Sequence, residues 1–192
     1  MAEANLQGYE LLVCVTGGIS AYKTASMVSG LVGREAGVTV AMTENATKLV
    51  GPPTFRALTG RGVHSDMWTQ GISADIEHLS LPDKADLVVV APATADILAK
   101  MAGGIADDLV STTLLSAEGP VLLAPAMNVR MWMNPATQNN VSILQSRGHI
   151  LVGPESGRQA CGQVGPGRMA EPETIIEAIE KILGQRKPKS GT

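Results

Sequence analysis

The sequence predicts a single α/β domain built on a doubly wound parallel sheet of the Rossmann-like or flavodoxin-like type. Short unbroken apolar runs alternate with segments of helical periodicity, a pattern typical of a parallel sheet covered on both faces. The length of 192 residues fits one sizeable core. A hydrophobic fraction of 44% against 17% charged residues indicates a packed chain and excludes a disordered one.

The strands are expected where the chain has short apolar runs rich in Val, Leu and Ile. These runs are residues 11–15, 38–42, 86–92, 120–125 and 149–153. The helices expected between and after them are residues 21–32, 94–102, 135–147 and 173–183. In the last helix the apolar residues recur at the 3.6-residue spacing of one helix face. Residues 184–192 are polar and are expected to form a frayed tail.

Composition excludes several classes of function. The net charge is −3, and no Lys/Arg run precedes the last few residues, which argues against a nucleic-acid surface. The two cysteines form no disulfide framework, so we expect a reducing compartment, the cytoplasm. No apolar stretch approaches the roughly 18 residues of a membrane span, and the polar N-terminus is not a signal peptide. Three His, two Cys and no CxxC motif indicate no zinc site.

A glycine turn, Gly17-Gly18-Ile19-Ser20, follows the first predicted strand and opens a helix. In a doubly wound sheet, ligands bind beyond the carboxyl ends of the strands, where this turn lies. Glycines let the backbone approach a ligand, and free N–H groups at a helix start attract an anion. The turn departs from the GxGxxG fingerprint, so a mononucleotide phosphate fits better than a dinucleotide. The alternative is a tight strand-to-helix turn.

Three polar residues have both a structural and a functional interpretation, and two of them, Thr43 and Thr94, lie at the same edge as the glycine turn. Thr43 and Thr94 follow the second and third strands, where each is either a helix N-cap or a contact to a shared ligand. His78 precedes the third strand, and its near-neutral titration suits a proton acceptor, although a lone histidine is more often structural. His64 and His149 have weaker cases, and His149, which begins a strand, is expected to be structural.

Two later segments carry further candidates. In PAMNVRMW, Asn128 offers a donor and an acceptor that suit a carboxylate or an amide; the alternative is a turn, with Met131 and Trp132 in the core. Residues 154–170 are rich in Gly and Pro around Cys161 and are expected to be a flexible, structureless flap that carries a reactive thiol. The alternative is a buried, inert cysteine. Cys14, in mid-strand, is expected to serve packing alone.

Five motifs then carry a resemblance over residues 9–183. GGISAYK, the His of IEH, APATAD followed by GIADDL, PAMNVRMW and ACGQVGPGRM occur in this order. The chain resembles the homo-oligomeric flavin-containing Cys decarboxylases, and the last two motifs are the specific ones. The resemblance implies one FMN-binding domain over residues 1–192, a Rossmann-like fold, and assembly as trimers or as dodecamers of trimers.

The resemblance also implies roles for individual residues. The residues that match flavin-binding positions are Gly17, Gly18, Ile19, Ser20, Thr43, Asn45, Thr94, Ala95, Asp96, Ile97 and Met127. The residues that match catalytic positions are His78, Asn128 and Cys161. Substrate contacts are implied for Asn128, Arg158, Ala160 and Met169, and no metal is implied. Many relatives carry an acid where this chain has Gln163; we expect changed contacts there and unchanged chemistry.

The implied reaction is FMN-dependent decarboxylation of 4′-phospho-N-pantothenoylcysteine to 4′-phosphopantetheine in coenzyme A synthesis, through thioaldehyde and enethiol intermediates. The cysteine nitrogen of this small acyl-cysteine is acylated, so no Schiff base with pyridoxal phosphate can form, and the flavin provides the electron sink instead. Cys161 matches the donor of the last proton. Because only a short tail follows Leu183, we expect either a stand-alone decarboxylase or part of a longer bifunctional chain.

Three alternatives remain. A peptidyl-cysteine decarboxylase of lantibiotic-type peptide maturation shares the fold, His and Asn, but stops at the enethiol and typically lacks the cysteine matched by Cys161. A flavin prenyltransferase shares the flavin site but not the His–Asn–Cys set. A flavoprotein regulator of a phosphatase is expected to carry an acidic tail, whereas this tail is basic.

Overall fold

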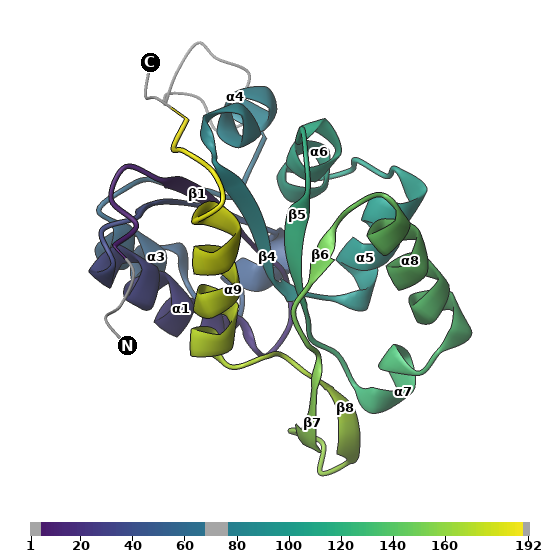
Figure 1. Ribbon diagram of the computed structural model, residues 1–192. Coiled ribbons are helices and arrows are strands. Elements are labelled where there is room, and N and C mark those ends of the chain that lie inside the picture. The colour runs from purple at the N-terminus through teal and green to yellow at the C-terminus, as the bar shows by residue number, and fades with distance from the viewer. Residues whose placement is uncertain (1–4, 68–76, 190–192) are drawn as a thin grey trace.

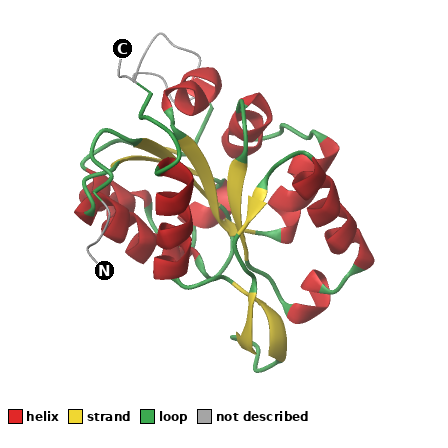
Figure 2. Ribbon diagram, viewed as in Figure 1, coloured by secondary structure: helices red, strands yellow, loops and turns green. Residues whose placement is uncertain are grey.

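A six-stranded parallel sheet forms the centre of the protein (Figures 1 and 2). A computed structural model describes residues 5–67 and 77–189. The strands are β1 (Glu10–Val15), β2 (Gly37–Met42), β3 (Val63–His64), β4 (Leu87–Ala93), β5 (Val121–Pro125) and β6 (Ile150–Leu151). Their order across the sheet is β3-β2-β1-β4-β5-β6, and every neighbouring pair is parallel. The predicted doubly wound sheet is therefore confirmed.

Helices cover both faces of the sheet (Figure 1). One face carries α1 (Ala21–Gly33), α3 (Pro52–Thr59) and α9 (Pro172–Leu183). The other face carries α4 (Glu77–Lys84), α5 (Ala95–Gly103), α6 (Leu109–Ser116) and α8 (Pro135–Ser146). Two short helices, α2 (Glu44–Thr47) and α7 (Val129–Trp132), follow β2 and β5. No helix within residues 5–67 and 77–189 is both long and apolar enough to cross a membrane.

The sheet divides the hydrophobic core into two layers. Beneath α1, α3 and α9 the core is aliphatic apart from Phe55, which is fully buried. α9 contributes its apolar face there through Ile175, Ile176, Ile179 and Leu183. The second layer lies beneath α5, α6 and α8. All seven residues of β4 are buried, because neighbouring strands and helices cover both of its faces.

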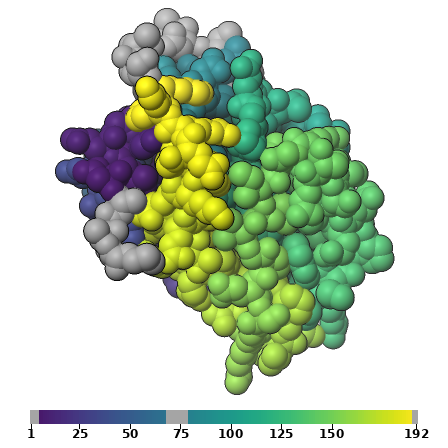
Figure 3. All heavy atoms as spheres, in the orientation of Figure 1, coloured from purple at the N-terminus to yellow at the C-terminus, as the bar shows by residue number. Residues whose placement is uncertain are grey.

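Residues 154–170 differ from the expectation of a structureless segment. They contain an antiparallel hairpin of β7 (Glu155–Arg158) and β8 (Val164–Arg168), which extends beyond the carboxyl edge of the sheet (Figures 1 and 3). Gly167 has a φ of +134°, a conformation that glycine adopts readily. Glycine and proline in this segment therefore shape a hairpin, although their abundance is typical of a loop.

The strand order reverses direction beside β1, and this reversal determines where a ligand can bind. From β1 the chain moves outward to β2 and β3, then crosses back to β4 on the other side of β1. The helices that follow β1 and β4 therefore diverge to opposite faces and leave a crevice at the carboxyl ends of these strands. The hairpin β7–β8 lies at this same edge (Figure 1).

Candidate active site

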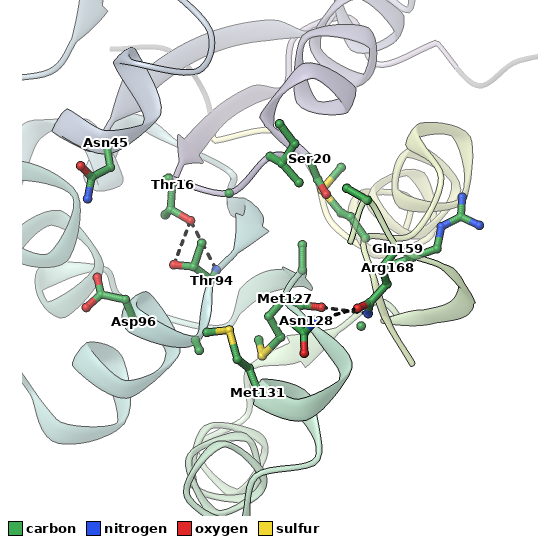
Figure 4. A pocket seen from close by; sticks show the side chains of 18 of the residues that line it. Thr16, Ser20, Asn45, Thr94, Asp96, Met127, Asn128, Met131, Gln159 and Arg168 are labelled. Atoms are coloured by element: carbon green, nitrogen blue, oxygen red, sulfur yellow. Dashed lines mark hydrogen bonds between the residues drawn. The ribbon is translucent and has the colours of Figure 1, made fainter. Parts of the chain in front are cut away.

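A cavity of about 1080 Å³ opens at the carboxyl ends of β1, β2, β4 and β5 (Figure 4). Segments far apart in the sequence line it, and it brings together most of the predicted site residues. The predicted residues in its lining are Gly17, Gly18, Ile19, Ser20, Thr43, Asn45, Thr94, Ala95, Asp96, Met127, Asn128, Arg158, Ala160, Cys161 and Met169.

The glycine turn after β1 packs tightly between the loops after β2 and β4. A Cβ atom on Gly17 would lie 2.4 Å from Asn45 Cβ, and one on Gly18 would lie 3.2 Å from Pro92 Cγ. Within the described chain, no protein group accepts a hydrogen bond from the backbone N–H of Ile19 or Ser20. The Ser20 side chain makes no capping bond to α1 either. The start of α1 thus offers backbone and hydroxyl donors to an anion in the cavity.

Thr43 and Thr94 are N-caps, as the structural interpretation predicts. The Thr43 side chain accepts from the Ala46 N–H, and the Thr94 side chain accepts from the Ile97 N–H, each at 3.3 Å. Both threonines also line the cavity, so capping and ligand contact are compatible. Capping fixes the direction in which α2 and α5 leave the sheet and so fixes this wall of the cavity.

Sequence reasoning missed Thr16, which is 2% exposed at the end of β1 and lines the cavity. Its hydroxyl donates to the carbonyl of Pro92, and the Thr94 N–H donates to Thr16 Oγ1 at 3.3 Å (Figure 4). These bonds connect the ends of the two strands that flank the crevice. The sequence did contain a signal for Thr16, because a hydroxyl residue directly follows a buried apolar strand at the edge where ligands bind.

Two predicted residues do not appear in the cavity lining. The Ile97 side chain is 1% exposed and packs in the core beneath α5, so only its backbone is left to meet a cofactor, and its assignment as a flavin contact stays a prediction. Ile97 is the third residue of α5, and this position on the helix turns its side chain toward the sheet. The backbone of His78 lies in the first turn of α4, but its side chain falls outside the described part of the structure.

Asn128 joins the loop after β5 to the hairpin. As the N-cap of α7, its Oδ1 accepts from the Arg130 N–H at 2.8 Å. Its Nδ2 lies 3.2 Å from Cys161 Sγ, 2.8 Å from Gln163 Oε1 and 3.3 Å from Gln159 Oε1. Cys161 is exposed, so the interpretation of a buried, inert cysteine is wrong. The geometry brings an amide donor and a thiol together at the cavity wall.

Met131 corrects another expectation. We considered a position for Met131 in the core, but it is 48% exposed and lines the cavity, whereas Trp132 packs partly buried against the second core layer. The short helix α7 turns Met131 outward beside Met127 (Figure 4). The two thioether side chains give this wall an adaptable apolar surface that suits a flat ring.

The basic residues of the cavity differ in how far their charges are neutralised. The hydrogen bond to Asp107, and the nearby charges of Asp108 and Asp96, hold the pKa of Lys100 well above its usual value. Lys100 is therefore a structural cation. Arg158 is exposed and forms no ion pair with any described residue, so its charge is available to a ligand.

A second group of charges holds the base of the hairpin. Lys23 of α1 binds Glu171 at 2.6 Å, and Arg168 of β8 binds the same carboxylate at 3.1 Å. Glu171 is the N-cap residue of α9, and both basic residues also line the cavity. The pKa of Glu171 is lowered, chiefly by the Lys23 hydrogen bond. The carboxylate therefore links α1, the hairpin and α9.

The remaining cysteine and histidine candidates are structural, as predicted. Cys14 is fully buried in β1, and burial raises the pKa of its thiol to about 12, so it stays protonated and unreactive. His149 Nδ1 accepts from the Val121 N–H at 3.2 Å and so joins β5 to the start of β6. No group of three or more His, Cys, Asp or Glu residues suited to a metal ion occurs in the parts of the chain that the structure describes.

Comparison with known proteins identifies the family. The model of the Flavoprotein family matches residues 1–184. The chain belongs to the Flavoprotein family. The sheet order and the cavity at the carboxyl edge agree with this membership.

Its curated relatives are proteins of coenzyme A biosynthesis. The chain is 46% identical over 180 residues to the coenzyme A biosynthesis bifunctional protein CoaBC of Bacillus subtilis, covering 94% of this chain and 44% of that protein. It is 46% identical over 173 residues to CoaBC of Escherichia coli K12, covering 90% and 43%. The chain therefore spans less than half the length of these curated relatives.

Solved structures show the same fold. A PPC decarboxylase with a Cys-to-Ser substitution, complexed with pantothenoylaminoethenethiol, matches with a TM-score of 0.83 at 27% identity, covering 93% of this chain and all of that one. The FMN-dependent cysteine decarboxylase SpaF matches with a TM-score of 0.81 at 35% identity, covering 94% and 98%.

Proposed function

We propose that this Flavoprotein member is an FMN-dependent decarboxylase that converts 4′-phospho-N-pantothenoylcysteine to 4′-phosphopantetheine. The observation that carries the proposal is the contact of Asn128 Nδ2 with Cys161 Sγ at 3.2 Å, across a cavity whose opposite wall is the glycine turn. The similarity to CoaBC and to PPC decarboxylase supports this choice of substrate.

The residues of the cavity fit FMN. A volume of about 1080 Å³ is at the upper end of small-molecule sites and accommodates a ring system and an acyl-cysteine together. The phosphate suits the start of α1, where the N–H groups of Ile19 and Ser20 are available, and the ring suits the wall formed by Met127. When bound, FMN supplies a reversible acceptor of two electrons. The other predicted flavin contacts are Gly17, Gly18, Thr43, Asn45, Thr94, Ala95 and Asp96.

The protein's own residues orient the substrate and move its protons. In the net reaction, the carboxylate leaves the α-carbon as CO2 and a proton takes its place. We assign the substrate carboxylate to Nδ2 of Asn128, because the Arg130 N–H already engages Oδ1; the carboxylate then replaces Gln163 Oε1 or Cys161 Sγ as a partner of this nitrogen. Arg158 provides a cation for the phosphate end, and Ala160 and Met169 line the intervening surface.

Two residues are assigned to proton transfer. Cys161 lies on the turn between β7 and β8 and delivers the final proton to carbon. His78, which precedes β4, is the base that accepts a substrate proton. A thiol suits the first role because it is far more acidic than a hydroxyl.

We further propose that the protein assembles as a homotrimer or as a dodecamer of trimers, in the cytoplasm. Ile19 and Tyr22 line the cavity and are 66% and 63% exposed, so a neighbouring subunit can cover them. Both cysteines are free, which supports a reducing compartment.

Mass spectrometry of the product tests the function. Purified protein with FMN is incubated with 4′-phospho-N-pantothenoylcysteine, and we expect 4′-phosphopantetheine with release of CO2. An accumulating product that lacks two further hydrogens indicates instead an enzyme that stops at the enethiol, as a peptidyl-cysteine decarboxylase does. Unchanged substrate overturns the assignment.

A further inference from the structure

Gln159 makes more contacts to the loop after β5 than any catalytic assignment requires. Its Nε2 donates to the carbonyl of Met127 at 3.2 Å and to that of Pro166 at 3.3 Å. Its Oε1 accepts from the Val129 N–H at 3.0 Å. The same oxygen accepts from Asn128 Nδ2 at 3.3 Å (Figure 4). One side-chain amide thus contacts three successive residues of the loop and one residue of β8.

The Gln159 side-chain amide is closely packed between β8 and the loop after β5. Met127 N donates to the carbonyl of Gly167 at 2.9 Å, which docks β8 directly against the loop. A Cβ atom on Gly167 would lie 2.3 Å from the Met127 carbonyl oxygen and 2.7 Å from Gln159 Nε2. A Cβ atom on Gly165 would lie 2.7 Å from Val129 Cγ2. The hairpin and the loop therefore meet without intervening space, and Gln159 fills the junction.

The direction of each hydrogen bond sets the orientation of Asn128. The Val129 N–H is a donor, so Gln159 must present its oxygen at that point. The same oxygen faces Asn128, which must then present its nitrogen, and Asn128 Oδ1 is held on the other side by the Arg130 N–H. The nitrogen that Gln159 fixes is the one that lies 3.2 Å from Cys161 Sγ.

We propose that Gln159 is a positioning residue that holds the Asn128 amide in contact with the Cys161 thiol. This inference rests on the proposed function, in which Asn128 holds the substrate and Cys161 supplies the last proton. Because the two residues are in contact, the substrate that Asn128 holds can lose its carboxylate and then receive the proton of Cys161 without leaving the site. Without Gln159 the hairpin loses its side-chain bonds to Met127 and Val129, and Asn128 keeps only its contacts with Gln163 and Cys161. The intermediate is then released before Cys161 protonates it, and its two electrons stay on the flavin until dioxygen removes them.

Hydrogen exchange tests the positioning without any substrate. In the wild-type protein the Val129 amide is expected to be protected, and Gln159→Met should accelerate its exchange by roughly tenfold because no acceptor remains. Gln159→Glu keeps an oxygen acceptor and should restore much of the protection. Gln138 is a matched control: it is an exposed glutamine on α8 that bonds the Trp132 carbonyl and lies outside the cavity, so Gln138→Met should leave Val129 unchanged.

The ratio of the two products, the saturated thiol and the form that lacks two hydrogens, tests whether Gln159 affects the final protonation. Gln159→Met should release a larger share of its product in the form that lacks two hydrogens, by about fivefold or more, whereas a purely structural defect lowers both products equally. Gln138→Met should give the same product ratio as the wild type.

The two tests separate the possible failures. An unprotected Val129 amide in the wild type, equal exchange in Gln159→Met and wild type, or an unchanged product ratio overturns the positioning role. If the wild type releases no CO2, the proposed function fails, and the exchange experiment still decides whether Gln159 orders the loop.

Discussion

The side-chain amide nitrogen of Asn128 lies 3.2 Å from the sulfur of Cys161. The two residues come from different elements, the loop after β5 and the turn of the hairpin β7–β8. The amide N–H donates to the sulfur, the sulfur lies 3.9 Å from both Gln159 Oε1 and Gln163 Oε1, and Cys161 lines the cavity, where a bound molecule can reach the thiol. The contact therefore suits a thiol that gives its proton to a bound molecule.

Replacing Cys161 with serine should separate decarboxylation from the final protonation. Serine is nearly isosteric but far less acidic than a thiol of pKa about 8.5. Cys161→Ser is expected to release CO2 while formation of the saturated thiol falls by roughly 100-fold. Mass spectrometry should detect a product that lacks two hydrogens. Cys14→Ser is not a suitable control because Cys14 is fully buried. Normal product at the wild-type rate excludes Cys161 as the donor.

The His78→Asn variant tests the proposed base. His78 lies outside the loops that we assign to FMN, so the variant should retain flavin while CO2 release falls by about 100-fold or more. Flavin absorbance per chain and CO2 release are measured on the same preparation. His64, on the edge strand β3, is absent from the cavity lining, and His64→Asn should keep its turnover. Near-normal turnover in His78→Asn shows that His78 is not the base.

A methyl group at Gly17 should weaken flavin binding. The added Cβ would lie 2.4 Å from Asn45 Cβ, so the turn after β1 must move away from the loop after β2. Gly17→Ala is expected to purify with much less FMN than the wild type, as absorbance and denaturant-released flavin report. Gly33, the last residue of α1, has open space around its Cβ position, and Gly33→Ala should retain FMN and gain up to about 1 kcal/mol of stability. Equal retention in both variants contradicts the assigned role of the turn.

The oligomeric state can be measured by light scattering. We expect flavin-loaded protein with a mass three times that of one chain, or a multiple of that value, because the exposed Ile19 and Tyr22 lie at the cavity. Dilution to monomer should abolish turnover. A fully active, flavin-loaded monomer shows that one chain completes the site alone.

His149 should make stability depend on pH in the mildly acidic range. Burial, reinforced by the charge of Arg147, lowers the pKa of His149 below its ordinary value near 6.5. Between these two values the unfolded chain binds more protons, so the free energy of unfolding falls as the pH drops below about 6.5. Protonation also requires Nδ1 to release the Val121 N–H. Urea unfolding of wild type and His149→Gln at pH 7.5 and 5.5 should show a smaller loss in the variant; equal losses contradict this.

The sequence predicted the parts of the fold that carry a clear hydrophobic pattern. The runs at 86–92 and 120–125 became β4 and β5 because apolar residues on both faces suit only a covered strand. The 3.6-residue pattern of 173–183 became α9. β3 has only two residues, so it leaves no periodic signal and depends on pairing with β2. The hairpin was missed because tertiary docking of Gly165 and Gly167, rather than strand propensity, holds it.

Most candidate site residues were predictable because the carboxyl ends of parallel strands meet at one edge. Side-chain direction was less predictable. Ile97 lies in the helical turn that Thr94 caps, but its side chain packs into the core, while Met131 turns outward into the cavity. Gln159 gave no signal at all, since its role depends on hydrogen bonds to the Met127 and Val129 backbones, which only the folded hairpin brings within reach.

The cavity joins residues from almost the whole length of the chain, from Thr16 to Met169. During synthesis, the loops after β1, β2 and β4 leave the ribosome long before the hairpin exists. When those loops have left the ribosome, α1 still lacks its packing partner α9, whose apolar face covers the same core layer. Contacts of such long sequence separation form late and slowly. Synthesis must therefore pass residue 169 before every wall of the cofactor pocket exists, and residue 183 before α9 can hold α1 in place.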